Sequence, residues 1–229
     1  MTKNTITDVF FDLDHTLWDF DKNSKLTFKY IFEKHKVQIN LDDFIKIYEP
    51  TNLKFWKLFR EEKISKKDLR YRRLKEVLEG VNYFASDNLI HQLSEDYITY
   101  LSDNNYLFDG TLDILEYLKP NYNLHIITNG FSNVQDNKMN KSGLAPYFKT
   151  LTDAETVGVK KPNPDIFNYA INKANTKVEN SIMIGDSLEA DIEGALNIGL
   201  KAIYFNPKKE STLPNIITID QLLQLKKHL

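Results

Sequence analysis

Four short segments of the chain carry the residue types that phosphate and metal chemistry requires. Three of them directly follow short apolar stretches, and the fourth is a loop that contains a lysine. In an open parallel sheet the ligand site lies beyond the carboxyl ends of the strands, so side chains that follow different strands meet there. We therefore expect one shared site. Its candidate residues are Asp12, Asp14, Thr128, Asn129, Lys161 and Asp186.

These residue types predict a site for a magnesium ion and a phosphoryl group. Asp12, Asp14 and Asp186 offer only hard oxygen ligands, which suit Mg²⁺ rather than Zn²⁺. A lysine and a threonine, with the backbone N–H groups that begin a helix, suit a phosphoryl group. One carboxylate can attack phosphorus to form an aspartyl-phosphate. A second carboxylate two residues further on can serve the leaving oxygen as an acid and a water molecule as a base.

Each segment alone also has an ordinary structural explanation. Asp12 and Asp14 can be solvated carboxylates in a turn, and Thr128 begins a common turn signal. Asp186 can belong to a helix cap, and Lys161 can be a surface lysine. The order of the four segments, each at a predicted strand end or in an adjoining loop, favours the shared site.

The pattern of apolar residues predicts strands that alternate with helices in the second half of the chain, and one strand near its beginning. This alternation indicates a doubly wound parallel sheet. The predicted strands are Ile6–Asp12, Asn123–Thr128, Ser181–Gly185 and Ala202–Phe205. The predicted helices are Thr111–Leu118, one that a Ser132–Gln135 capping box opens and that ends near Gly143, Asp165–Ala174, Leu188–Ile198, and a last helix opened by Thr218 and Gln221.

Between residues 19 and 103 the sequence has a helical period and contains one glycine and one proline. We expect four helices and no strands there, with Ser65 and Ser86 opening two of them and Pro50 marking a kink or a helix boundary. The predicted fold class is thus α/β, a doubly wound parallel sheet with an inserted all-helical domain. The domains are a core of residues 1–18 and 104–229 and an insert of residues 19–103.

Composition excludes several classes of protein. The 229 residues include 30 Lys and Arg and 32 Asp and Glu, a net charge of −2, which argues against a globally basic nucleic-acid binder. The absence of cysteine excludes disulfides, thiolate metal sites and a cysteine nucleophile. The sequence contains neither a secretory signal nor an apolar stretch long enough to span a membrane. We therefore expect a cytoplasmic protein with no nucleic-acid and no membrane partner.

The motifs resemble those of the haloacid dehalogenase (HAD) superfamily of phosphohydrolases, and the resemblance covers nearly the whole chain. Haloacid dehalogenases proper lack a second aspartate at the position of Asp14, so the chain resembles the phosphatases of this superfamily. The four motifs are FFDLDHTL at Phe10–Leu17, IITNG at Ile126–Gly130, VGVKKPNPDIF at Val157–Phe167 and MIGDSLEAD at Met183–Asp191.

The resemblance implies a role for each motif residue. It implies Asp12 as the nucleophile and Asp14 as the general acid and base. Lys161 would stabilise charge, with Lys160 as the competing assignment, and Asp191 would orient Lys161. The implied phosphate ligands are Thr128, Asn129 and Lys161, and the implied Mg²⁺ ligands are the side chains of Asp12 and Asp186 and the backbone carbonyl of Asp14.

The helical insert corresponds to the cap of this superfamily, which closes over the site and reads the substrate. Within the superfamily the chain resembles the pyrimidine 5′-nucleotidases, through LWDFD after the first motif, the segment Asn52–Trp56 and TNGF at Thr128–Phe131. We therefore expect Asn52 and Trp56, four residues apart on a predicted helix, to face the active-site cleft and select a nucleoside 5′-monophosphate. The segment Lys54–Lys75, with ten Lys and Arg and three acids, is either a solvated face or an attractor of anionic substrate.

Other functions remain open at this point. The same superfamily contains sugar-phosphate phosphatases and phosphomutases. A receiver-like signalling module also combines a phosphorylated Asp with Thr and Lys, but its acid pair precedes the lysine, whereas Asp186 and Asp191 follow Lys161. A catalytically silent binding protein is disfavoured because every catalytic position is filled. The expected partner is a small phosphorylated metabolite, and the expected state is a monomer or a small homo-oligomer.

Overall fold

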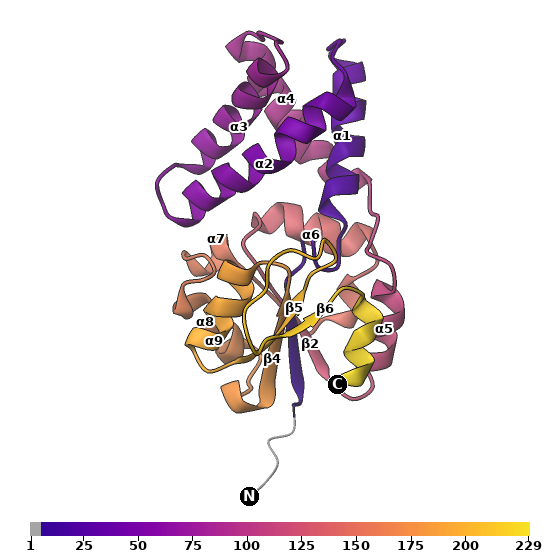
Figure 1. Cartoon of the computed structure of the whole chain (residues 1–229), viewed down its shortest axis with the longest axis vertical. Helices are drawn as coiled ribbons and strands as arrows, with labels where there is room; N and C mark the ends of the chain where they lie inside the picture. The colour runs from indigo at the N-terminus through magenta and orange to yellow at the C-terminus, as the bar shows by residue number, and fades with distance from the viewer. Residues whose placement is uncertain (1–5) are drawn as a thin grey trace, which may run out of the picture. The chain divides into compact units, whose positions relative to one another are not determined.

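The computed structural model describes residues 6–229 and divides into two compact units (Figure 1). One unit extends to Phe20 and resumes at Asn105, and the other comprises Asp21–Asn104. Residues 1–5, part of the predicted core, lie outside the described residues. Among the residues from 6 onward, no helix is both long and apolar enough to cross a membrane.

The first unit is built on a six-stranded sheet in which every pairing is parallel, which confirms the predicted doubly wound α/β fold. The strand order is β3-β2-β1-β4-β5-β6, so the direction of winding reverses between β1 and β4. The carboxyl ends of the strands at such a reversal are where open α/β sheets bind ligands. The strands are β1 (Asp8–Phe11), β2 (Asn123–Thr128), β3 (Thr150–Asp153), β4 (Ser181–Gly185), β5 (Lys201–Phe205) and β6 (Ile217–Ile219).

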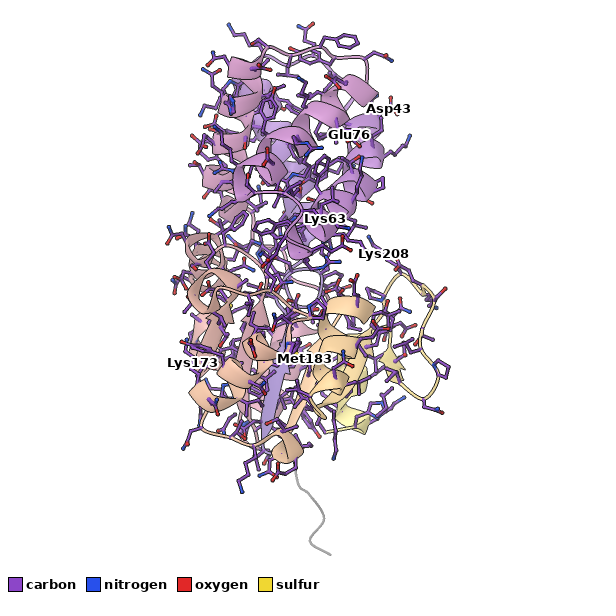
Figure 2. The ribbon with its side chains drawn as sticks, turned by 90° about the vertical axis from the view of Figure 1, so that its left-hand side faces the viewer. Asp43, Lys63, Glu76, Lys173, Met183 and Lys208 are labelled. Atoms are coloured by element: carbon purple, nitrogen blue, oxygen red, sulfur yellow. The ribbon has the colours of Figure 1, made fainter. Side chains whose placement is uncertain are left out.

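Helices cover both faces of this sheet, with α8 and α9 on one side and α5 on the other (Figure 1). The side chains of Phe10 and Met183, from the sheet, and of Phe167, from α8, are fully buried in one core (Met183 is labelled in Figure 2). The helical elements of this unit are α5 (Thr111–Leu118), α6 (Ser132–Lys141), η2 (Ala145–Tyr147), α7 (Ala154–Val157), α8 (Pro164–Lys173), η3 (Val178–Asn180), the π-helical η4 (Leu188–Glu193), α9 (Gly194–Asn197) and η5 (Leu222–Lys227).

The second unit contains the four predicted helices. Phe28 packs against the rings of Phe44, Tyr48 and Tyr97 with centroid separations of 4.6–4.8 Å, and these aromatic residues form its core. Its elements are α1 (Phe20–Lys34), α2 (Leu41–Arg60), α3 (Lys66–Gly80), α4 (Asp87–Tyr100) and η1 (Leu101–Asp103). The predicted N-caps Ser65 and Ser86 are confirmed, since each hydroxyl accepts a backbone N–H three residues further on.

Pro50 does not end a helix, as the sequence allowed, but lies inside α2. A proline within a helix removes one backbone hydrogen bond. The helix continues because Phe44, Tyr48 and Phe55 are buried along one face on both sides of Pro50. Tertiary packing therefore outweighs the local cost of the proline.

Three local predictions in the first unit are wrong. The capping box of Ser132 and Gln135 does not form, because Phe131 occupies the N-cap position and the Ser132 hydroxyl hydrogen-bonds to Asp153 instead. Thr218 lies in β6 and does not open the last helix; that helix, η5, has Gln221 as its N-cap and is a 3₁₀ helix. The edge strands β3 and β6 are absent from the predicted set because they are only four and three residues long and contain threonine in place of a continuous apolar stretch.

Candidate active site

A tight loop after β1 positions Asp12 and Asp14 at the carboxyl edge of the sheet. The N–H groups of Leu17 and Trp18 both donate to the carbonyl of Leu13, which closes the loop directly behind the two aspartates. The side chain of Asp12 is 10 % exposed, whereas that of Asp14 is 22 % exposed. One carboxylate is thus enclosed and the other is partly open to solvent.

Lys161, in the loop that precedes α8, is buried against Asp12. Its Nζ lies 2.5 Å from Asp12 Oδ1 and 2.6 Å from Asp191 Oδ1, and it donates to the carbonyl of Ile127 at 2.7 Å. Asn129 fixes the backbone of this lysine, because its amide accepts the Lys161 N–H at 2.8 Å and donates to the Lys161 carbonyl at 3.0 Å. Lys160, the competing residue, is only partly buried.

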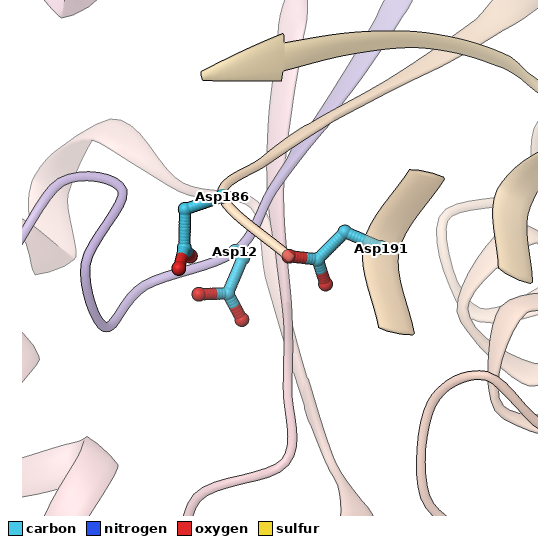
Figure 3. Close-up of side chains that lie close together, drawn as sticks. All are labelled: Asp12, Asp186 and Asp191. Atoms are coloured by element: carbon cyan, nitrogen blue, oxygen red, sulfur yellow. The ribbon is translucent and has the colours of Figure 1, made fainter. Parts of the chain in front are cut away.

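Asp186 and Asp191 complete an acidic cluster with Asp12 (Figure 3). One carboxylate oxygen from each residue lies within 4.8 Å of the others. Asp186 follows β4 and accepts a hydrogen bond from the Thr16 hydroxyl at 3.0 Å, while Asp191, on η4, accepts the Ser187 N–H at 3.0 Å. The predicted strand-end residues of the first unit therefore meet at one edge of the sheet.

Burial and mutual repulsion act on the charges of this cluster. Burial raises the pKa of Asp12 to about 7, with Lys161 opposing and Asp191 and Asp14 adding to the shift. Burial, followed by repulsion from Asp12 and Asp191, raises the pKa of Asp186 well above its ordinary value. Burial would lower the pKa of Lys161, but the attraction of Asp12 and Asp191 outweighs it and raises that pKa. Lys161 is therefore a permanent cation.

The donor set fits a hard divalent cation. Asp12, Asp186 and Asp191 supply only oxygen atoms, and Asp14 adds a fourth carboxylate close by. Two buried ammonium groups, those of Lys161 and Lys138, balance part of this charge and leave two negative charges when all six groups are ionised. Clustered carboxylates that repel one another are stabilised by a metal ion, and oxygen ligands of this kind suit Mg²⁺.

Thr128 is 1 % exposed at the end of β2. Two residues absent from the predicted site, Gln135 and Lys138, lie close by: Gln135 contacts both Thr128 and Asp14, and Lys138 contacts Asp14. The Thr128 hydroxyl accepts from Gln135 Nε2 at 2.6 Å, and the same Nε2 donates to Asp14 Oδ2 at 3.0 Å. The Nζ of Lys138 lies 2.5 Å from Asp14 Oδ1. Gln135 and Lys138 lie three residues apart, on one face of a helix that directly follows a site motif, and this spacing is the signal that could have revealed them.

Asn52 and Trp56 both lie on α2 in the second unit, and their surroundings differ. Asn52 is 4 % exposed, and its Oδ1 accepts a hydrogen bond from the buried guanidinium of Arg73 at 2.6 Å. Trp56 is partly exposed and packs edge-on against Phe59 with a ring separation of 5.7 Å. Within α2, therefore, the amide oxygen of Asn52 already has a partner, and the indole of Trp56 is the more accessible of the two groups.

Comparison with known proteins finds relatives over most of the length of the chain. Residues 9–205 match the family model described as haloacid dehalogenase-like hydrolase. The chain is 32 % identical to pyrimidine 5′-nucleotidase YjjG of Escherichia coli, over 86 % of this chain and 85 % of the relative. It is 31 % identical to a glyceraldehyde 3-phosphate phosphatase of Methanothermobacter thermautotrophicus, over 96 % of this chain and 97 % of the relative.

A solved structure shares the complete fold. The crystal structure of the Bacillus subtilis protein YfnB bound to magnesium superposes with a TM-score of 0.89 at 30 % identity, and the match covers 98 % of this chain and 99 % of that one. The similarity therefore extends through both units of the chain.

Proposed function

Because this chain belongs to the haloacid dehalogenase-like hydrolases, we propose that it is a magnesium-dependent phosphomonoesterase that acts through an aspartyl-phosphate. The observation that carries the proposal is the buried contact between Lys161 and Asp12, beside Asp186 and Asp191. A carboxylate enclosed by a permanent cation, further acids and a phosphate-binding hydroxyl matches the requirements of phosphoryl transfer.

In the proposed reaction a carboxylate oxygen of Asp12 attacks phosphorus while the bond to the ester oxygen breaks. Asp14 gives its proton to the departing oxygen, so that an alcohol leaves. Asp14 then takes a proton from a water molecule, which attacks the aspartyl-phosphate and releases inorganic phosphate with Asp12 restored. When bound by Asp12, Asp186 and the Asp14 carbonyl, Mg²⁺ would neutralise charge on the phosphoryl oxygens.

Lys161 and Thr128 are proposed to hold the phosphoryl oxygens. The ammonium of Lys161 lies against Asp12, so it can follow the charge that moves onto the transferred group. Asn129 acts on Lys161 through two backbone hydrogen bonds, and its own contact with phosphate stays a prediction.

The proposed substrate is a nucleoside 5′-monophosphate, with Asn52 and Trp56 contributing to its selection. The resemblance to YjjG, a pyrimidine 5′-nucleotidase, supports this choice. A sugar-phosphate phosphatase is the alternative, because a glyceraldehyde 3-phosphate phosphatase is related over a larger share of the chain at nearly the same identity. A phosphomutase of the same superfamily would differ in transferring the phosphoryl group back to a sugar rather than to water.

The test is a phosphate-release screen of the purified chain over nucleoside monophosphates and sugar phosphates, with Mg²⁺, with EDTA and with Ca²⁺. We expect turnover with Mg²⁺ only, because the larger Ca²⁺ takes more ligands at longer distances and disturbs in-line attack. Asp12→Asn should abolish turnover without loss of folding. Turnover in EDTA, or full activity of Asp12→Asn, would contradict the proposal.

A matched pair of lysine variants tests the assignment of the cation. Lys161→Met should lower kcat on the order of 10²–10³-fold, the usual effect of removing one group that stabilises the transition state. Lys160→Met should retain activity, because its side chain is only partly buried and the Asp12 contact belongs to Lys161. Loss of activity in Lys160→Met with retention in Lys161→Met would reverse the assignment.

A further inference from the structure

Two side chains of α6 converge on Asp14, the proposed general acid and base. Lys138 Nζ lies 2.5 Å from Asp14 Oδ1, and Gln135 Nε2 donates to Asp14 Oδ2 at 3.0 Å. The two residues are three positions apart and therefore project from one face of the helix. Each oxygen of the Asp14 carboxylate thus has its own donor from the same rigid element.

The ammonium group of Lys138 is buried beside two aromatic rings. The residue is 2 % exposed, and its Nζ lies 4.3 Å from the centre of the Trp18 ring and 5.5 Å from that of Phe20. Removing an ammonium from water is costly, and a buried ion pair seldom adds net stability over apolar residues of similar volume. The position of this ammonium group beside the proposed general acid and base is therefore better explained by a role in orienting the Asp14 carboxylate than by a contribution to stability.

Gln135 connects Asp14 to the phosphate-binding hydroxyl. Its Nε2 donates to Thr128 Oγ1 at 2.6 Å as well as to Asp14, and the residue is fully buried. Gly130 makes this path possible, because a Cβ at position 130 would collide with the Gln135 side chain. The glycine of the second motif is therefore required for close approach of the amide, in addition to any role in a turn.

We propose that Lys138 and Gln135 are positioning residues that hold the Asp14 carboxylate in the orientation needed for proton transfer, an inference that rests on the proposed phosphatase function. Each carboxylate oxygen has two lone pairs, so one donor on each oxygen leaves a second position for the proton that Asp14 gives or takes. Without these donors the side chain of Asp14, which is 22 % exposed, would be free to rotate toward solvent.

The proposal predicts a loss that depends on the leaving group. A p-nitrophenolate departs without a proton, whereas the ribose oxygen of a nucleoside 5′-monophosphate needs one from Asp14. In the Mg²⁺-loaded enzyme, Lys138→Met should slow first-turnover release of nucleoside on the order of 10²-fold, the cost of a misplaced catalytic group. First-turnover release of p-nitrophenol from its phosphate ester should change by no more than about threefold, with KM for both substrates little altered.

Three further variants control the experiment. Gln135→Met also removes the donor to Thr128, so it should add a loss common to both substrates to a smaller selective loss. The difference between its losses on the two substrates decides the outcome if Lys138→Met does not fold. Lys138→Arg should recover part of the nucleoside rate, because it keeps a cation next to Asp14. Lys141→Met, on the exposed part of the same helix, should leave both rates unchanged. Thermal melting shows which variants are folded.

The outcomes separate this inference from the function on which it rests. An equal loss on both substrates in a folded variant assigns Lys138 a merely structural role and overturns the proposal. Unchanged rates on both substrates in Lys138→Met also overturn it. A wild-type enzyme that releases phosphate from neither ester, by contrast, overturns the proposed function itself.

Discussion

His125 and Asp8 form a buried polar pair at the end of the sheet opposite the candidate site. His125 is 1 % exposed and stacks on Phe10 with a ring separation of 4.7 Å. Its Nε2 lies 3.1 Å from Asp8 Oδ1 and its Nδ1 lies 2.8 Å from Thr150 Oγ1. Burial lowers the pKa of His125 below its ordinary value of 6.5, although Asp8 opposes the shift. The folded protein therefore holds this histidine in its neutral form more strongly than the unfolded chain does.

This pair predicts a loss of stability in mild acid. Below about pH 6.5 the unfolded chain binds a proton at His125 that the folded protein does not, so the free energy of unfolding falls as the pH falls. His125→Gln should have a flatter dependence between about pH 6.5 and pH 5 than the wild type. The measurement is urea unfolding across this range, with the slope of stability against pH as the readout.

The comparison between variants is needed because other groups act in the opposite direction. Because the pKa of Asp12 is raised to about 7, the folded protein binds a proton at Asp12 at a higher pH than the unfolded chain does. The contribution of Asp12 to the free energy of unfolding therefore rises as the pH falls through 7. Saturating Mg²⁺ in both samples holds this contribution constant. Parallel pH profiles for the wild type and His125→Gln would show that His125 does not titrate differently in the folded and unfolded states.

At the scale of single elements, the start of α3 depends on a reciprocal cap. Ser65 Oγ accepts the Asp68 N–H at 3.0 Å, and Asp68 Oδ2 accepts the Ser65 N–H at 3.3 Å. Ser65→Ala should destabilise this helix by about 1 kcal/mol, the usual cost of losing an N-cap. Faster hydrogen exchange of the first-turn amides of α3 is the measurement.

The N-cap of α4 provides a matched comparison. Ser86 accepts the Leu89 N–H at 3.3 Å, without the reciprocal bond that Asp68 gives to Ser65. Ser86→Ala should therefore have a smaller effect on α4 than Ser65→Ala has on α3. Equal effects at the two caps would mean that the reciprocal bond contributes nothing measurable.

At the scale of the whole molecule, the chain leaves and re-enters the sheet-containing unit at adjacent points. Trp18 pairs antiparallel with Leu107, and the Asp19 N–H donates to the Tyr106 carbonyl at 3.0 Å. The Phe108 N–H donates to the Leu17 carbonyl, also at 3.0 Å. Both ends of the helical insert are therefore held by backbone hydrogen bonds that belong to this unit alone.

A short flexible linker in place of residues 21–104 should therefore leave a folded core. The sheet and the cluster around Asp12 lie within the remaining residues, so the variant should still hydrolyse p-nitrophenyl phosphate. It should lose its preference between phosphorylated metabolites, because cap domains supply substrate selection in the proposed mechanism. Melting curves and kcat/KM for both substrate types are the measurements. A variant that does not fold, or one that keeps its full substrate preference, would contradict this view.

The sequence alone determined the fold class and the arrangement of the strand-end residues. Apolar segments such as Asn123–Thr128 and Ser181–Gly185 can be predicted as buried strands, because the pattern that indicates a strand lies within the segment itself. Parallel pairing then carries their carboxyl ends to one edge, so Asp12, Thr128 and Asp186 meet as expected. The roles of these residues and the substrate stay predictions.

Only the tertiary structure decided the hydrogen-bond partners of residues whose local sequence allowed more than one. Gln135 has the spacing of a capping box with Ser132, yet its amide donates to the Thr128 hydroxyl and to Asp14. The Ser132 N–H at the start of the helix instead donates to Glu155. Lys138 is an ordinary basic residue near the end of a helix by sequence, and only the folding of α6 against the loop after β1 encloses it beside Asp14. Contacts between segments more than one hundred residues apart leave no local pattern, so their physical origin lies in the packing of the complete core.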